Sequence, residues 1–173
     1  THWAKLNNLK QAAKTMNFLT EHGISSYGEL ESKLTAVSAR RDTAHAEIKR
    51  IETRSAELAL VMKHAGTYRQ LKPLYERYRK SNDKEKFLRG HESEIILFEA
   101  TARELKRLGT VPLPTTESMK TELANLNAEK ERLLTEYKTA RTEAQEYDIV
   151  KQNVDALLAV PKEQEQQRRH ELE

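Results

Sequence analysis

The residues of this chain best suited to metal or acid–base chemistry are six histidines. They stand at His2, His22, His45, His64, His91 and His170. None has the His-x-His or His-x-x-x-His spacing that places two imidazoles on one metal ion. Glu92 and Glu94 beside His91 could be an acid–base cluster, but charged residues on a helical protein ordinarily form its solvated face. There is also no glycine-rich phosphate loop or nucleophile turn. We therefore expect no metal, no cofactor and no catalytic residue.

A second set of residues could bind phosphate. Between Tyr68 and His91, eight Lys and Arg stand against three Asp and Glu, a local net charge of +5 in a chain of net +3, so the remainder nets −2. Tyrosine and phenylalanine are interleaved with these cations, as binding to a phosphate backbone and unstacked bases would require. The candidate nucleic-acid-binding residues are Arg69, Lys72, Tyr75, Arg77, Tyr78, Arg79, Lys80, Lys84, Lys86 and Arg89.

The same segment has a structural interpretation. Tyr68, Leu71, Leu74, Tyr75 and Tyr78 recur at helical spacing, so the rings could be a small core with the cations as its solvated side. Both interpretations stay open, and both hold together if the hydroxyl edges remain exposed.

Two heptad ladders flank the basic segment, and their alternating spacing of four and three predicts helices that face a partner along a narrow seam. The first ladder is Leu30, Leu34, Val37, Arg41, Ala44, Ile48, Ile51, Ser55, Leu58, Met62 and Ala65. The second is Met119, Leu123, Leu126, Lys130, Leu133, Tyr137, Ala140, Ala144, Tyr147, Lys151, Val154 and Leu158. With 37% hydrophobic and 33% charged residues and a mean hydropathy of −0.83, the composition suits seams and a small core. The sequence thus predicts an all-α fold without a catalytic pocket.

Glycine and proline divide the chain into helices. The expected segments are an N-terminal helix (1–23), a first coiled-coil helix (26–66), a basic helical tip with its connector (67–114), a second coiled-coil helix (115–160) and a polar tail (161–173). Gly23, Gly66 and Gly109 are expected to end helices, and Pro73 to open one or kink one under way. Polar residues 162–173 predict a frayed helix or a disordered tail.

Within these segments the caps and faces can be placed. Asn82 with Glu85 forms a capping box for a helix that extends to Leu108, with Gly90 as a weak point, and Thr115 or Thr116 caps the second ladder helix. The N-terminal helix is expected to turn one apolar face toward the base of the fold. That face consists of Trp3, Leu6, Leu9, Ala13, Met16 and Leu19.

The ladders most economically form an antiparallel hairpin within one chain, with the basic tip at its far end. In one consistent register, Tyr137 faces Ile51 and Lys130 lies beside Leu58. An intermolecular coiled coil, in which each ladder pairs with its copy in a homodimer, remains the competing arrangement.

Composition also bounds location. The chain has no cysteine, which suits a reducing cytoplasm. No run of about 18 apolar residues is present, so membrane insertion is not expected. The chain begins inside an expected helix and ends in Leu172-Glu173, so we expect a fragment of a longer protein.

Three stretches carry a resemblance: WAKLNNLKQAAKTMNFLTEHGISSYGELE (3–31), HESEIILFEATARELKRLG (91–109) and EYDIVKQNVDALL (146–158). They resemble the carboxyl-terminal region of relaxases, the bacterial mobilization nucleases of conjugative and mobilizable elements. In that family an amino-terminal domain nicks DNA with a tyrosine and a histidine-bound metal. This sequence matches neither motif, so no catalytic residue carries over. The resemblance implies an accessory domain of a DNA-processing protein, with the nuclease chemistry upstream.

Two classes of function follow. The first is a non-catalytic accessory module that helps a relaxase grip or position DNA at the transfer origin through its basic tip. The second is a protein-interaction element that docks the relaxase to a coupling protein, a relaxosome factor or a second copy through the ladder faces. An enzyme in its own right comes third, and we expect the chain to have no nuclease activity.

Overall fold

The fold is all-α. The computed structural model describes residues 2–170, with the backbone alone for residues 160–165 and 170. Four helices follow one another along the chain: α1 (His2–Glu21), α2 (Tyr27–Lys80), α3 (Lys84–Arg107) and α4 (Thr116–His170). Helices α2 and α4 pack against each other within the chain, so the predicted hairpin is confirmed.

Two glycines end helices as the sequence predicted. Gly23 and Gly109 have φ values of 63° and 69°, in the left-handed region that glycine adopts without a Cβ clash. After each glycine the next amide donates back across the turn, from Ile24 to the carbonyl of Leu19 (2.8 Å) and from Thr110 to that of Leu105 (3.1 Å). These bonds satisfy carbonyls that the helix ends would leave unpaired.

Other predicted boundaries were wrong. Helix α2 does not stop at Gly66, which lies inside it. Pro73 also lies inside α2, so of its two predicted roles it does not open a helix. A glycine costs a helix only about 1 kcal/mol, and Ala65 and Tyr68, on either side of Gly66, pack into one apolar cluster that offsets this cost. Helix α4 likewise does not end before Pro161 but continues to His170, so the first alternative for the polar tail, a helix, holds as far as that residue. Residues 171–173 of the expected tail lie outside the described residues.

The caps differ in detail. The side chain of Asp83, not Asn82, caps α3 by accepting from the amide of Lys86 at 3.0 Å. The predicted weak point at Gly90 corresponds to non-helical backbone at the next residue, His91 (φ −141°, ψ 22°). Thr115 caps α4 as predicted, since its hydroxyl accepts from the amide of Ser118 at 3.1 Å.

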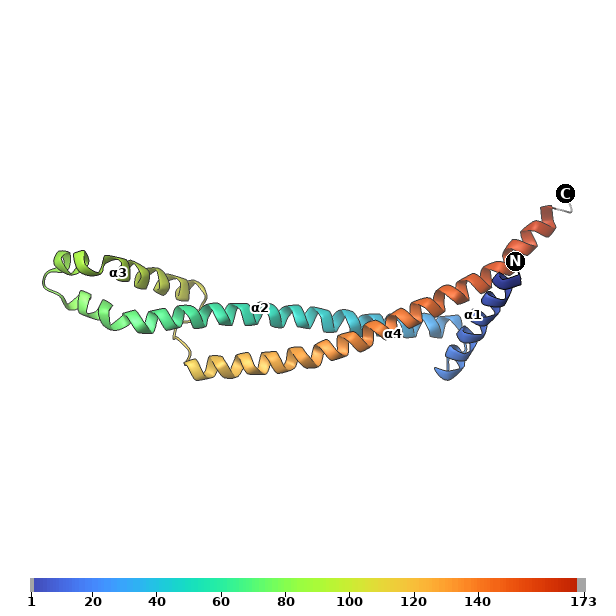
Figure 1. The fold of residues 1–173 in the computed structure, drawn as a ribbon, viewed down its shortest axis with the longest axis horizontal. Coiled ribbons are helices and arrows are strands. Elements are labelled where there is room, and N and C mark those ends of the chain that lie inside the picture. The colour runs from blue at the N-terminus through green and yellow to red at the C-terminus, as the bar shows by residue number, and fades with distance from the viewer. Residues whose placement is uncertain (1, 171–173) are drawn as a thin grey trace. The chain divides into compact units, whose positions relative to one another are not determined.

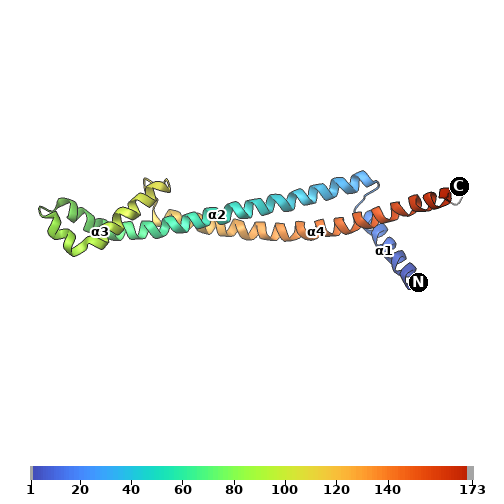
Figure 2. The same cartoon turned by 90° about the horizontal axis from the view of Figure 1, so that it is seen from above.

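The chain divides into two compact units. Unit 1 contains Thr1–Ala46 and Leu133–Glu173, and unit 2 contains Glu47–Arg132. In unit 1, α1 lies across α4 (Figure 2). The core of unit 1 joins buried residues of α2 and α4, all of them ladder positions except Val150, with Ile24, which follows the α1 cap. These residues are Ile24, Leu30, Val37, Ala144, Tyr147 and Val150.

The face that α1 turns toward this core is not the predicted one. Thr15 is buried, and Phe18 and Leu19 pack against the core, whereas Leu9 and Met16 are exposed. Thr15 tolerates burial because its hydroxyl donates to the carbonyl of Gln11 (2.9 Å) and accepts from the side-chain amide of Asn153 (3.2 Å). Of the predicted face, only Leu19 packs inward.

In unit 2, α3 folds back along the end of α2 (Figure 1). The core joins apolar residues of α2 and α4, all of them ladder positions except Val61, with the C-terminal part of α3. Its buried members are Leu58, Val61, Ala65, Leu105 and Met119.

The two ladders are antiparallel, but the predicted register was displaced by about one heptad. In unit 1 the ring of Tyr137 lies 5.6 Å from that of His45, not opposite Ile51. In unit 2 the Lys130 ammonium lies 2.8 Å from Glu52, one to two turns short of the predicted neighbour Leu58. A seven-residue slip keeps ladder positions facing ladder positions, so the apolar spacing alone does not choose between the two registers.

Candidate nucleic-acid interface

The aromatic residues of the basic segment form a continuous row between α2 and α3. Tyr68 and Tyr75 stack on Phe98, with ring centroids 4.9 and 4.3 Å away, and Tyr75 lies 5.9 Å from Tyr78. Phe87 extends the row, 6.0 Å from Tyr78. All except the buried Phe98 are half-buried. The rings thus hold the two helices together, as the structural interpretation predicted.

The row limits what the tyrosines can offer a ligand. The Tyr75 hydroxyl lies 3.5 Å from the Glu99 carboxylate, at the limit of a hydrogen bond. Tyr75 and Tyr78 therefore serve mainly to pack α2 against α3, and part of each side chain is still open to solvent.

Four of the candidate cations have partners within the chain. The Arg69 guanidinium donates to the carbonyl of Pro114 (2.6 Å) and the hydroxyl of Thr116 (2.7 Å), which fastens the connector to α2. Arg77 lies over the ring of Phe87 at 5.8 Å, and Lys84 lies over that of Tyr78 at 5.9 Å. Arg89 is 3.8 Å from Glu85, an exposed pair of little energetic weight. Sequence reasoning missed the structural role of Arg69, because its partners lie 45 and 47 residues further along the chain.

The other four candidate cations are open to solvent. Lys72, Arg79, Lys80 and Lys86 are exposed, and within the described part of the chain their side chains form no ion pair, hydrogen bond or ring contact. On α2, Lys72 and Arg79 are seven residues apart and share one helix face with Lys80 at its edge. Glu76 stands on the same face and reduces its charge by one. The surface they form can neutralise phosphates without first breaking a contact.

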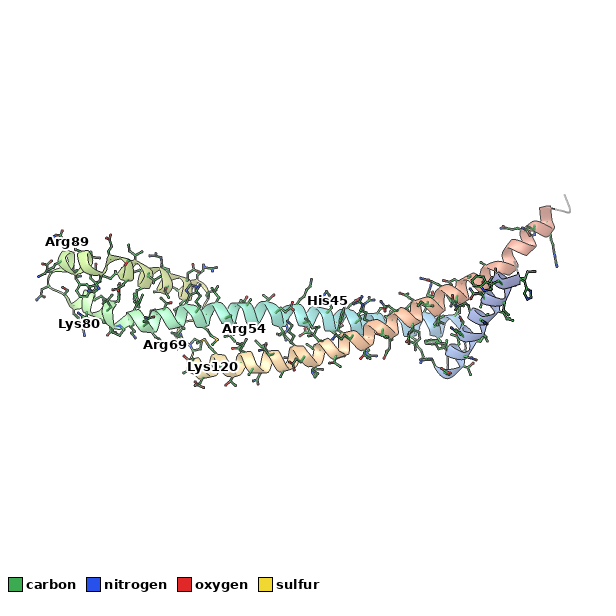
Figure 3. All side chains as sticks on the ribbon, in the orientation of Figure 1. His45, Arg54, Arg69, Lys80, Arg89 and Lys120 are labelled. Atoms are coloured by element: carbon green, nitrogen blue, oxygen red, sulfur yellow. The ribbon has the colours of Figure 1, made fainter. Side chains whose placement is uncertain are left out.

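These cations lie on both sides of one turn. Lys80 ends α2, the turn follows, and Lys84 begins α3. Figure 3 shows Lys80 and Arg89 projecting near this turn, and Arg69 beside the start of α4. We call the exposed set Lys72, Arg79, Lys80 and Lys86 the basic surface.

The possible acid–base cluster is only a pair on one helix. His91 Nδ1 lies 2.8 Å from a carboxylate oxygen of Glu94, while Glu92 is exposed and has a different direction on the helix. No group of three or more His, Asp or Glu side chains that could hold a metal lies together among the residues the structure describes. In the same residues, no helix has the length and apolar character needed to cross a membrane.

Comparison with known proteins gives no further assignment. No family model, curated protein or solved structure matches the chain.

Proposed function

We propose that this chain is a non-catalytic helical accessory module that contacts nucleic acid through the basic surface of unit 2. The observation that carries the proposal is the set of four exposed cations without partners, in a segment of net charge +5. A paired helical scaffold holds them at fixed spacing, which lowers the entropic cost of binding a phosphate backbone. Such contacts position a protein on DNA and carry no sequence information.

The resemblance to relaxases supplies the proposed context. A module of this kind would add sequence-independent affinity near a transfer origin, while strand cleavage would belong to another domain of the same protein. The alternative, docking of a coupling protein or a second copy through the ladder faces, has less support. Ladder residues such as Ile51 and Ala140 are completely buried, so a partner would need a different surface.

Fluorescence anisotropy with labelled single-stranded and duplex DNA at low salt tests the proposal. The test variant changes Lys72, Arg79 and Lys80 to Gln and should bind at least about tenfold more weakly than the unmodified chain. A matched control changes Lys33, Lys138 and Arg141 to Gln. These residues are exposed in unit 1 and carry the same total charge.

The comparison separates local contact from net charge. If the control weakens binding as much as the test variant, binding follows overall charge and the basic surface is not the site. If the unmodified chain does not bind at low salt, the proposal is wrong.

A further inference from the structure

The exposed side of α1 carries an apolar stripe that the fold does not use. Leu6, Leu9, Ala13 and Met16 follow one another at spacings of three, four and three residues. Leu6, Leu9 and Met16 are 45%, 67% and 58% exposed. Trp3, 75% exposed, stands beside the stripe. Monomeric soluble proteins seldom leave such residues together without a partner.

The stripe is separate from the face by which α1 packs into unit 1. The opposite side of the helix is anchored to α4, through the bond between Asn153 and Thr15 and the edge contact of Phe18 with Tyr147 at 5.2 Å. Helix α1 therefore has two apolar faces, and α4 occupies one of them.

The width of the stripe indicates what covers it. At 3.6 residues per turn, its four residues fall within about 80° of the helix circumference. A helix that lies in a membrane surface presents a broader apolar face, whereas a strip with residues only at two heptad positions is the seam of a helix pair. The spacing thus favours a helical partner.

The flanking charges indicate the character of that helix. Lys5 and Lys10 border the stripe on opposite sides, at the positions where paired helices exchange ion pairs. Lys14 lies further from the stripe, and α1 has no acidic residue before Glu21. A second copy of α1 would set lysine against lysine, which is unfavourable.

We propose that the stripe of α1 binds an amphipathic helix of another protein that carries apolar residues at heptad spacing and acidic residues beside them. Burial of Leu6, Leu9, Ala13 and Met16 provides the affinity. The flanking lysines, Lys5 and Lys10, provide the specificity for an acidic partner. This site lies in unit 1 and does not depend on nucleic-acid binding by unit 2.

A synthetic peptide of about three heptads, with Leu at the seam and Glu at the flanking positions, is a direct probe. Alone, its glutamates repel one another and it stays unfolded. Mixed with the full chain, it should gain helicity by circular dichroism and shift the emission of Trp3, the single tryptophan, to shorter wavelength. The same peptide with Lys in place of Glu should do neither.

Variants assign the contacts. Changing Leu9 and Met16 to Gln should weaken binding of the acidic peptide by about tenfold or more. Changing Lys5 and Lys10 to Glu should reverse the preference, so that the lysine peptide binds. Changing Lys14 to Glu, on the same helix but away from the stripe, should leave both results unchanged. Unaltered thermal melting of each variant shows that α1 remains folded.

Four results would overturn the inference. Equal binding of the two peptides, or no helicity gain by either peptide at about 100 µM, would show that the stripe does not select an acidic helix. A shift of Trp3 emission on phosphatidylglycerol vesicles without peptide binding would indicate a membrane surface. Self-association of the chain that the Leu9 and Met16 changes abolish would make a second copy the occupant.

Discussion

Replacement of Ile51 by Ala should destabilise unit 2 strongly, because this ladder side chain is 0% exposed. The change removes three carbon groups, worth about 2.4 kcal/mol of transfer free energy at about 0.8 kcal/mol each. The cavity left behind adds to this, so we expect the free energy of unfolding to fall by about 3 kcal/mol. Leu60, on the same helix and 38% exposed, is the matched control, and its replacement by Ala should cost under about 1 kcal/mol.

Urea unfolding followed by far-ultraviolet circular dichroism measures both losses. The midpoint should move to much lower urea for the Ile51 variant, and the slope of the transition should stay the same if only stability has changed. Equal losses for the two variants would refute the placement of Ile51 at the seam. If the unmodified chain unfolds in more than one transition, the two units unfold separately, and each transition is then compared between the variants by itself.

Three further predictions concern single contacts. Replacing Arg69 by Ala should lower the melting temperature but leave DNA affinity nearly unchanged, because its guanidinium holds the connector; a large loss of affinity at unchanged stability would contradict this. The pKa of Glu29 is lowered because its carboxylate accepts hydrogen bonds from the amide and hydroxyl of Ser25. This contact therefore stabilises the fold above about pH 4.5, and the stabilisation is lost as the pH falls through the pKa of the folded state. In the Glu29→Gln variant the melting temperature should depend less on pH below that point, and a pH profile equal to that of the unmodified chain would refute the contact. Cysteines in place of His45 and Tyr137, in a chain with none of its own, should be joined within one chain by a short thiol cross-linker, and products only between chains would contradict the hairpin.

The sequence predicted the paired helices well because heptad spacing is a strong signal. Register was harder, since a slip of one heptad presents the same ladder residues to each other. Ion pairs between the helices accompany the observed register, such as Arg40 with Glu143 in unit 1 (3.3 Å) and Arg54 with Glu122 in unit 2 (2.7 Å). Each links residues that are 68 or more positions apart in the sequence, so no local sequence pattern predicts it.

The face of α1 and the ends of the long helices were missed for other physical reasons. Helix α1 has apolar residues on two sides, and periodicity alone favoured the side with Leu9 and Met16. The buried residue is Thr15, whose hydroxyl is satisfied by a side chain of α4. Gly66 was expected to be a break, yet a glycine costs a helix only about 1 kcal/mol, and α2 continues through it. Helix α4 continues through Pro161 as well, although a proline inside a helix costs about 3 kcal/mol.

For the candidate site, the sequence located the basic segment but could not separate contact from support. The helical spacing of Tyr75 and Tyr78 allowed either role, and only the position of Phe98, 20 or more residues away on α3, shows that the rings pack between helices. Among the cations, likewise, only tertiary contacts show that Arg69 holds the connector while Lys72 stays open to solvent.

The salt dependence of DNA binding tests the central claim most directly. The logarithm of the association constant for duplex DNA should fall linearly with the logarithm of salt concentration, with a slope of about −0.9 for each phosphate neutralised. Changing Lys72, Arg79 and Lys80 to Gln should make this slope shallower by up to about 2.7 if each contacts one phosphate, and changing the sequence of the duplex should have little effect. An unchanged slope in the triple variant, or binding that does not respond to salt, would contradict charge-driven contact through the basic surface.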